Sequence, residues 1–175
     1  NVDREKKKIR QLSNCLKEIS KNCFIPITAG GGIENIKDAK FIFRSGADKI
    51  LFNTGLIKNK KLVNEIANIY GEQSIIASID VKIENRKYCV YINNGKEKIN
   101  IEFKKYLKEI ENLPIGEILL NSIDRDGTGF GLDLNLIKFI KDFKKPIILS
   151  GGLGKKEHFL DCLKNYSVDA VSTAN

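Results

Sequence analysis

Two predicted strands in the sequence end at consecutive glycines. They are "IPITAGGG" (Ile25–Gly32) and "PIILSGG" (Pro146–Gly152), in which an apolar run stops at consecutive glycines. Glycines between a strand and a helix let backbone N–H groups approach an anion, and the helix N-terminus adds a favourable field. A tight turn that requires only a positive φ is the plainer alternative. One strand after each glycine group comes a short polar residue, Thr54 or Asn175, and this pattern favours a ligand with a phosphate at each end.

A carboxylate at another strand end could supply acid–base chemistry. Asp80 ends the apolar segment "SIIASID", where burial would raise the carboxyl pKa and suit it to general acid–base catalysis. The alternative is an aspartate satisfied by Lys82 or by a backbone N–H. In "SIDRDGTG", Asp126 and Gly127 form a turn, and we expect Asp126 to shape the loop or to aid phosphate binding rather than to do chemistry.

The composition argues against nucleic-acid binding, a membrane span and a metal site. The net charge is +8, but the lysines are spread over all predicted helices among Ile, Asn and Glu, which is typical of solvated helix faces and not of a nucleic-acid surface. No window of about 18 apolar residues is present, so we expect no membrane span and predict a cytoplasmic protein. The four cysteines lack metal-ligand spacing, and Cys15 and Cys162 fall in amphipathic helices, where we expect buried free thiols. With His158 as the single histidine, neither a metal nor a cofactor is expected.

Helices and strands alternate along the chain. Helical periodicity covers residues about 5–20, 33–46, 59–71, 102–113, 132–143 and 155–166, with Gly46 as the C-cap of the second helix. Strands are predicted at 24–29, 47–54, 74–82, 116–124, 145–152 and 168–174, and a β-hairpin at 87–101 with Asn94-Gly95 at its turn. Strands that are apolar on both faces predict a parallel α/β sheet, either covered on both faces or closed into a barrel.

An internal repeat favours the barrel. Aligning Pro26 with Pro146 brings Gly46–Thr54 onto Ser167–Asn175, so two βα units recur with an offset of about 120 residues. A fourfold unit used twice gives a (β/α)8 TIM-type barrel, of which residues 1–175 would hold strands three to eight as a single domain, with the hairpin after strand five. That barrel would lack roughly 45–50 residues at the front and the last helix at the back. The absence of Met agrees with an interior piece of a longer protein.

Two charged residues fall at the opposite ends of the strands. Lys49 lies early in "ADKILFNT" and Glu117 at the start of "GEILLNSID", which places both at the bottom of a barrel core. A salt bridge that closes this end of the core is one explanation. By the repeat, the first barrel strand, outside this chain, would carry a carboxylate that forms an acid–base pair with Asp80 across the barrel mouth.

Six segments together resemble one family, the cyclase subunit of imidazole glycerol phosphate synthase. They are "IPITAGGGI", "GADKILFNT", "SIDVK", "GEILLNSIDRDGTGFG", "SGGLGKKEHF" and "VDAVSTAN", in the family's order and spacing over essentially the whole chain. The resemblance implies a (β/α)8 barrel and a lyase of histidine biosynthesis. Such an enzyme uses ammonia to convert a two-phosphate nucleotide intermediate into imidazole glycerol phosphate and aminoimidazole carboxamide ribotide. It also implies a glutaminase subunit docked on the amino-terminal face, with ammonia passing through the barrel core.

The resemblance further implies a role for individual residues. Asp80 corresponds to one of two catalytic aspartates, the other lying on the missing first strand. The residues implied at the two phosphate sites are Gly32, Asn53 and Thr54 for one, and Asp126, Gly127, Gly152, Ala174 and Asn175 for the other. Lys49 and Glu117 match half of a charged ring that gates the ammonia path, and Asp48 matches a residue facing the glutaminase.

The chain also departs from the family pattern. Asn175 stands where the family has Ser, and "ASIDVK" replaces the commoner "AIDAK". These variants resemble a paralogous branch that delivers ammonia to a sugar in surface-polysaccharide synthesis. A related two-phosphate isomerase fits less well, because the hairpin after Asp80 and "DKILFNT" favour the cyclase. A third alternative is that the 175-residue chain by itself is inactive, because six strands leave two unpaired sheet edges and one catalytic carboxylate is missing.

Overall fold

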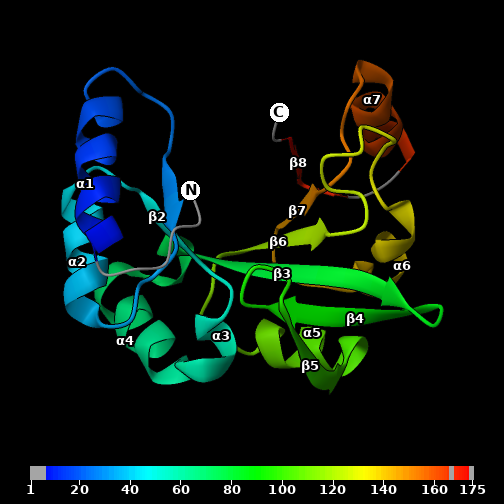
Figure 1. Ribbon diagram of the computed structural model, residues 1–175, viewed down its shortest axis with the longest axis horizontal. Helices are drawn as coiled ribbons and strands as arrows, with labels where there is room; N and C mark the ends of the chain where they lie inside the picture. The colour runs from blue at the N-terminus through cyan, green and yellow to red at the C-terminus, as the bar shows by residue number, and fades with distance from the viewer. Residues whose placement is uncertain (1–6, 166–167, 174–175) are drawn as a thin grey trace. The chain divides into compact units, whose positions relative to one another are not determined.

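The computed structural model describes residues 7–165 and 168–173 (Figure 1). The helices are α1 (Lys7–Ser20), α2 (Ile36–Arg44), α3 (Gly55–Lys58), α4 (Lys60–Tyr70), α5 (Phe103–Glu111), α6 (Ile137–Ile140) and α7 (Lys156–Asn165), with 3₁₀ turns η1 (Glu72–Ser74) and η2 (Leu134–Leu136). The strands are β1 (Thr28–Gly30), β2 (Lys49–Phe52), β3 (Ile75–Glu84), β4 (Lys87–Ile92), β5 (Glu97–Glu102), β6 (Glu117–Ser122), β7 (Ile147–Ser150) and β8 (Ala170–Ser172). Among these described residues, no helix is both long and apolar enough to cross a membrane.

The strands form one hydrogen-bonded series in the order β1-β2-β3-β6-β7-β8, and β4 and β5 extend from β3 as an antiparallel meander. The β1–β2, β2–β3, β6–β7 and β7–β8 pairs are parallel. The chain divides into two compact units, the first with the described parts of Asn1–Ala77 and Leu113–Gly116, the second with those of Ser78–Asn112 and Glu117–Asn175. The predicted alternation of helices with parallel strands is therefore confirmed.

In the first unit, aliphatic side chains of β2 and of helices α2 and α4 form the core. Ile42 of α2, Val63 and Ile66 of α4 and Ile50 of β2 are fully buried. Helix α2 begins where the Asn35 side chain accepts hydrogen bonds from two backbone N–H groups, as an N-cap does. The structure places the C-cap of α2 at Ser45 and the positive φ of 105° at Gly46, one residue from the predicted assignment.

In the second unit, strand alternation separates a buried face from a half-buried one. Ile118, Leu120 and Ser122 of β6 are buried on one side, whereas Glu117, Leu119 and Asn121 are half-buried on the other. Because paired strands share the orientation of their side chains, the half-buried Ser150 of β7 lies on the same side as its register partner Asn121. The carboxyl ends of β6 and β7 thus present polar groups on one face.

The meander is built from two tight turns. The predicted hairpin between β4 and β5 is confirmed, with positive φ at Asn93, Asn94 and Gly95. A second hairpin, between β3 and β4, was not predicted; it turns at Asn85 and Arg86, which both have positive φ. Asparagine tolerates this conformation, but Asn-Arg is not one of the common hairpin sequences, so the signal was weak.

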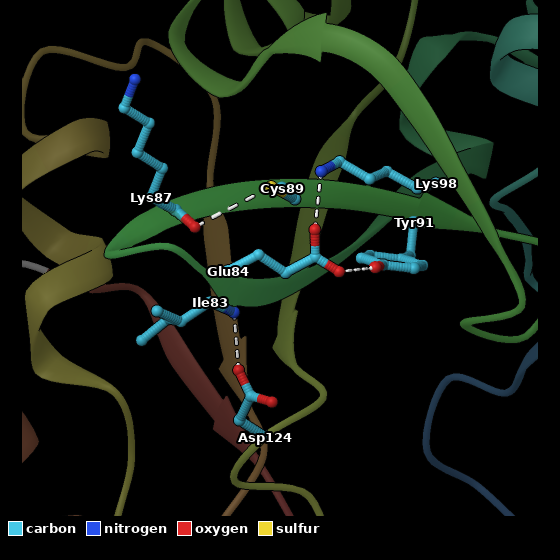
Figure 2. Close-up of polar contacts among 7 residues, drawn as sticks. All are labelled: Ile83, Glu84, Lys87, Cys89, Tyr91, Lys98 and Asp124. Atoms are coloured by element: carbon cyan, nitrogen blue, oxygen red, sulfur yellow. Dashed lines mark hydrogen bonds and ion pairs between the residues drawn. The ribbon is translucent and has the colours of Figure 1, made fainter.

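Polar contacts fix the end of β3 within the second unit (Figure 2). Glu84 accepts hydrogen bonds from Lys98 Nζ at 2.6 Å and from the Tyr91 hydroxyl. The Lys98 contact, and then that of Tyr91, lowers the pKa of Glu84 to about 2. One residue earlier, the Ile83 N–H donates to Asp124 Oδ2 at 2.6 Å, which ties β3 to the loop after β6.

Three predictions of local structure were wrong. The strand expected at 24–29 starts only at Thr28, where pairing with β2 begins, and Phe24 and Ile25 are 95% and 73% exposed. The helix expected at 132–143 is reduced to η2 and α6, and the chain beyond it turns away as the Lys144 N–H donates to Glu111.

The third wrong prediction concerns one thiol. Cys15 is exposed, although Cys162 is buried as expected. Short helix α3 was also not foreseen.

Candidate active site and anion pocket

The sequence repeat has a counterpart in the pairing of the strands. Thr28 pairs with Lys49 and Gly30 with Leu51 in β1–β2, while Ile148 pairs with Ala170 and Ser150 with Ser172 in β7–β8. The two registers are equivalent under the sequence alignment, in which the second strand of each pair is shifted by one residue more than the first. The two βα units therefore match in hydrogen bonding as well as in sequence.

An aspartate anchors each of these two strand pairs. Asp48 Oδ2 accepts a hydrogen bond from the Ile27 N–H at 2.8 Å, and Asp169 Oδ2 accepts one from the Ile147 N–H at 2.8 Å. In return, the Asp48 and Asp169 N–H groups donate to the carbonyls of the same two isoleucines. Through these hydrogen bonds, Asp48 is part of the strand pairing in its own unit. The residue is exposed, and its predicted role in facing a glutaminase stays a prediction.

The glycines at the strand ends are needed for backbone geometry. Gly151 and Gly152 have φ of 96° and 94°, and their repeat partners Gly31 and Gly32 have 104° and 69°. A Cβ at Gly151 would lie 2.6 Å from the Ser122 carbonyl oxygen, and one at Gly152 would collide with the Gly131 carbonyl oxygen. Positive φ and close approach together exclude other side chains at Gly151 and Gly152.

A pocket of about 370 Å³ lies within the second unit, beside these glycines. Its walls come from the loop after β6 and from the ends of β7 and β8. The lining residues are Asp126, Gly127, Thr128, Gly129, Ser150, Gly151, Gly152, Leu153, Ser172 and Thr173. The structure thereby brings together Asp126, Gly127 and Gly152 of the predicted phosphate site; Ala174 and Asn175 lie outside the described residues.

A backbone hydrogen bond holds the pocket's two loops against each other: the Gly131 N–H donates to the Gly152 carbonyl at 2.7 Å. Inside the loop after β6, the Arg125 side chain donates from Nη1 to the Gly131 carbonyl at 3.3 Å. Within the loop, Thr128 Oγ1 donates to the Arg125 carbonyl at 2.7 Å. Glycine-lined backbone of this kind can bring N–H groups close to an anion, which carboxylate-rich or apolar walls cannot do.

Asp80 lies on β3 in the same unit and is half-buried. Asn121 Nδ2 on the neighbouring strand β6 donates to Asp80 Oδ1 at 3.3 Å. Burial raises the pKa of the Asp80 carboxyl above its ordinary value of 3.8; the Asn121 hydrogen bond opposes this effect and the charge of Asp126 adds to it. A carboxyl whose pKa is raised in this way holds a proton to higher pH than a free aspartate does, which suits it to acid–base chemistry.

The other predicted phosphate residues follow adjacent strands of the first unit. Gly32 comes after β1 and Asn53 and Thr54 come after β2, and the β1–β2 register ends at Gly30 and Leu51. The Thr54 hydroxyl donates to Asn53 Oδ1 at 3.4 Å. A Cβ at Gly32 would meet no atom within 4 Å, so its turn faces open space.

The two predicted gate residues begin their strands. Lys49 is the first residue of β2 in the first unit, and Glu117 is the first residue of β6 in the second unit. Both are half-buried. Their common role stays a prediction.

Sequence reasoning missed Asn121, the hydrogen-bond partner of Asp80. Its signal was present in "GEILLNSID", where a polar residue interrupts an apolar strand near its carboxyl end. Counting in steps of two from Glu117 places Asn121 on the half-buried face of β6. His158, which the sequence gives no catalytic role, lies on α7, where its Nδ1 accepts a hydrogen bond from the Gly154 N–H at 3.4 Å.

Comparison with known proteins adds an independent finding. Residues 2–175 match the model of a family described as "Histidine biosynthesis protein". The chain is 42% identical over 176 residues to a protein of Parasynechococcus marenigrum (strain WH8102) that is named, provisionally, imidazole glycerol phosphate synthase subunit hisF2; the match covers 100% of this chain and 65% of the relative.

Two further relatives carry the name imidazole glycerol phosphate synthase subunit HisF. The one from Pyrobaculum aerophilum is 42% identical over 161 residues, covering 91% of this chain and 63% of the relative. The one from Leptospira biflexa serovar Patoc is 41% identical over 167 residues, covering 94% of this chain and 66% of the relative. The chain thus spans between 63% and 66% of the length of these three relatives.

Proposed function

Because the chain belongs to the histidine biosynthesis protein family, we propose that it is part of the cyclase subunit of imidazole glycerol phosphate synthase. In this proposal the enzyme uses ammonia to convert the two-phosphate nucleotide intermediate of histidine biosynthesis into imidazole glycerol phosphate and aminoimidazole carboxamide ribotide. The observation that supports it most is the position of Asp80. Its side chain accepts a hydrogen bond from Asn121 on β6, and β6 pairs with β7. Strand β7 ends at the glycine-lined pocket.

Asp80 is the proposed proton-transfer group. Its pKa is raised by burial, which favours a carboxyl that can exchange a proton during ring closure and cleavage. A second aspartate, which the family resemblance assigns to a strand outside this chain, would act as its counterpart. One carboxyl can then donate a proton to the leaving group while the other accepts a proton from the attacking nitrogen.

Two anion sites would hold the ends of the substrate. The pocket of the second unit, with Asp126, Gly127 and Gly152, is proposed for one phosphate, completed by Ala174 and Asn175. The strand ends of the first unit are proposed for the other phosphate, through Gly32, Asn53 and Thr54. Binding at both ends fixes the reacting carbon and nitrogen atoms between them, which lowers the entropic barrier to ring closure.

The ammonia is proposed to come from a glutaminase subunit. Asp48 would contact that partner, and Lys49 and Glu117 would contribute to a charged ring that gates the path of ammonia toward Asp80. We also propose that the two compact units belong to one barrel domain, because β3 runs through both of them.

The test is ammonia-dependent turnover by the full-length enzyme that contains this chain. With ammonium chloride and the two-phosphate nucleotide intermediate, Asp80→Asn is expected to lower kcat by at least about 100-fold, the range for loss of a general acid–base group. The matched control is Asp142→Asn, which removes an exposed carboxylate after α6 and should leave turnover unchanged. Full activity of Asp80→Asn would contradict the assignment.

A second candidate function rests on the two departures from the family pattern, Asn175 and "ASIDVK". In that alternative the barrel delivers ammonia to a sugar in surface-polysaccharide synthesis. The same assay separates the two. A folded wild-type enzyme that turns over a nucleotide-linked sugar with ammonium, and leaves the histidine intermediate untouched, would favour the paralogue.

A further inference from the structure

Charged and polar side chains share one face of the meander with Asp80. Because side chains alternate along a strand, Asp80 and Glu84 of β3 point to the same side. Asp80 pairs in register with Tyr91 of β4, and Tyr91 pairs with Lys98 of β5; such cross-strand partners lie on a common face. The residues that are buried on the opposite face are Val81, Val90 and Ile92. The meander therefore presents its polar groups on the side of the proposed proton-transfer group.

The Glu84 carboxylate is held by side chains from the other two strands of the meander. Its own register partner, Lys87, points away from it (Figure 2). Instead, Lys98 Nζ donates to Oε2 at 2.6 Å, and the Tyr91 hydroxyl donates to Oε1. Each carboxylate oxygen thus has one donor, and the two donors belong to residues that are register partners of each other.

These two donors select an ionised carboxylate. The hydrogen bond from Lys98, and then that from Tyr91, lowers the pKa of Glu84 to about 2, and the Glu84 contact raises the pKa of Lys98. An ammonium and a hydroxyl that each take one oxygen match a planar group with two acceptor oxygens, and a charged donor strengthens the contact. The arrangement is therefore a template for a carboxylate, whichever molecule carries it.

The Glu84 carboxylate is free to exchange with a solute. Its side chain is 32% exposed and that of Lys98 is 48% exposed, so solutes can reach the contact. Glu84 is also the last residue of β3. The hairpin around it is attached by other bonds, because the Ile83 N–H and the Tyr88 hydroxyl each donate to an aspartate outside the meander. The carboxylate can therefore turn outward while the hairpin stays in place.

The strand pairing is irregular at this position. The β4–β5 register shifts between Cys89 and Tyr91, since Cys89 pairs with Glu102 but Tyr91 pairs with Lys98. Bulges re-aim side chains and are over-represented next to functional sites. Neighbouring strands lie about 4.8 Å apart, so Lys98, two strands from Asp80, is within roughly 10 Å of it. One ligand can therefore reach both the donor pair and Asp80.

We propose that Tyr91 and Lys98 form a binding site for the carboxylate of a small organic acid, and that Glu84 is an internal competitor that occupies this site until the acid binds. The acid would take over the two hydrogen bonds that Glu84 now accepts. This site is separate from both proposed phosphate positions and does not depend on them. It adds organic acids to the ligand classes of the face that carries Asp80.

The first experiment uses acetate as the probe and the full-length enzyme that contains this chain. Binding is followed through the NMR signals of the β4 and β5 amides. Wild type should bind acetate weakly, because a tethered carboxylate competes at a high effective concentration. Glu84→Ala, which removes the competitor, should lower the Kd for acetate at least about tenfold. If the alanine variant does not fold, Glu84→Gln, which is neutral and similar in size, should change the Kd in the same direction.

The second experiment tests the two donors in the background of the Glu84 variant. Lys98→Met should abolish saturable binding of acetate, because the charged donor is lost. Tyr91→Phe should weaken binding about fivefold, as expected for one hydrogen bond. The matched control is Lys87→Met, which removes a lysine of the same hairpin that points away from the site and should leave the Kd unchanged. Acetamide, which has the shape of acetate without its charge, and inorganic phosphate should shift the same signals less strongly than acetate does.

Three outcomes would overturn the inference. The first is an equal Kd for acetate in wild type and in the Glu84 variant. The second is an equal loss of binding in Lys98→Met and Lys87→Met. The third is binding of acetamide or inorganic phosphate at the β4 and β5 signals as tight as that of acetate. None of these readouts involves turnover, so the proposed function, which is tested through Asp80→Asn, stands or falls separately.

Discussion

At the scale of single residues, Asp80 shows how burial and hydrogen bonding oppose each other. Removal from water disfavours the ionised carboxylate, and the Asn121 amide stabilises it, with burial as the larger effect. The folded state therefore binds a proton at Asp80 more readily than the unfolded chain does. An ionised Asp80 lowers stability, which is expected for a group retained for its chemistry.

This opposition predicts a specific pH dependence of stability. Because the pKa is raised on folding, the contribution of Asp80 favours folding below its ordinary pKa and is lost as pH rises through the folded value. Asp80→Asn should therefore gain unfolding free energy relative to wild type as pH rises from about 4 to 7. Urea unfolding at a series of pH values measures this difference, and a difference that shrinks with pH would contradict it.

Glu84 is the opposite case, and it predicts the opposite dependence. Its pKa falls to about 2 in the folded state, so its contribution is present above the ordinary value of 4.5 and is lost as pH falls toward 2. Glu84→Gln should speed hydrogen exchange of the β4 amides at pH 7, and the difference from wild type should disappear near pH 2.

The control for this prediction is Glu18→Gln. It removes an exposed ion pair with Lys21 on α1, in the other compact unit. It should leave exchange of the β4 amides unchanged. Equal exchange in wild type and Glu84→Gln at pH 7 would show that the contacts in Figure 2 do not hold the meander.

At the scale of secondary structure elements, strand pairs and not helices hold the candidate site. The pocket lies where β7, β8 and the loop after β6 end, and Asp80 and Asn121 come from neighbouring strands. Tyr88 on the meander reaches the segment before η2, because its hydroxyl donates to the buried Asp133 Oδ2 at 2.8 Å. The β3–β4 hairpin is thus fastened at two neighbouring points, by Asp124 through Ile83 and by Asp133 through Tyr88.

The two aspartate anchors allow a matched comparison between elements. Asp48→Asn and Asp169→Asn each weaken a hydrogen bond from a backbone N–H to a carboxylate, so each should lower the free energy of unfolding by about 1 kcal/mol. If Asp48 also contacts the glutaminase, only Asp48→Asn should weaken that complex. Thermal unfolding and a binding titration with the glutaminase measure the two effects, and equal loss of binding in both variants would reject a specific interface role for Asp48.

Many of the strands and their pairing could be predicted from the sequence. The strands around Ile50, Leu120 and Leu149 are apolar runs, and their positions and parallel pairing are confirmed. One face of each strand is buried and the other is half-buried, so the apolar run marks the strand clearly. The failures occur where tertiary contacts override a local pattern. Phe24 and Ile25 fit a strand by residue type, yet the neighbouring strand offers pairing only from Thr28 onward.

The candidate site could be predicted in part. Glycines and Asp126 at strand ends are visible as interruptions of apolar runs, and the structure brings several of them into one pocket. Asn121 could not be recognised as the partner of Asp80 from sequence, because 41 residues and a meander separate them. Its role depends on the pairing of β3 with β6, which no local pattern specifies.

At the scale of the whole molecule, the predicted fold class, an incomplete (β/α)8 TIM-type barrel of the α/β class, is confirmed. The family match covers residues 2–175, and six parallel strands with a hairpin inserted after the Asp80 strand have the expected order. Among the described residues, β1 pairs only with β2, and β8 pairs only with β7. Within the part of the chain that the structure describes, these two strands are therefore edges that other chains could pair with.

This organisation predicts that the purified 175-residue chain has no cyclase activity. It supplies Asp80 but not the second proposed aspartate, so acid–base chemistry is incomplete. The measurement is turnover of the two-phosphate intermediate with ammonium chloride, compared with the full-length enzyme at equal concentration. Activity within about tenfold of that of the full-length enzyme would contradict the proposal that catalysis needs a second carboxyl from outside this chain.

The equivalent registers of β1–β2 and β7–β8 have a further consequence. Every measurement made on one βα unit has an internal replicate in the other, at a known position of the same polypeptide under the same solvent conditions. A substitution that acts through strand pairing must give the same result at both positions. A substitution whose effect differs between the two positions reports what the surroundings of each strand pair add to the shared register.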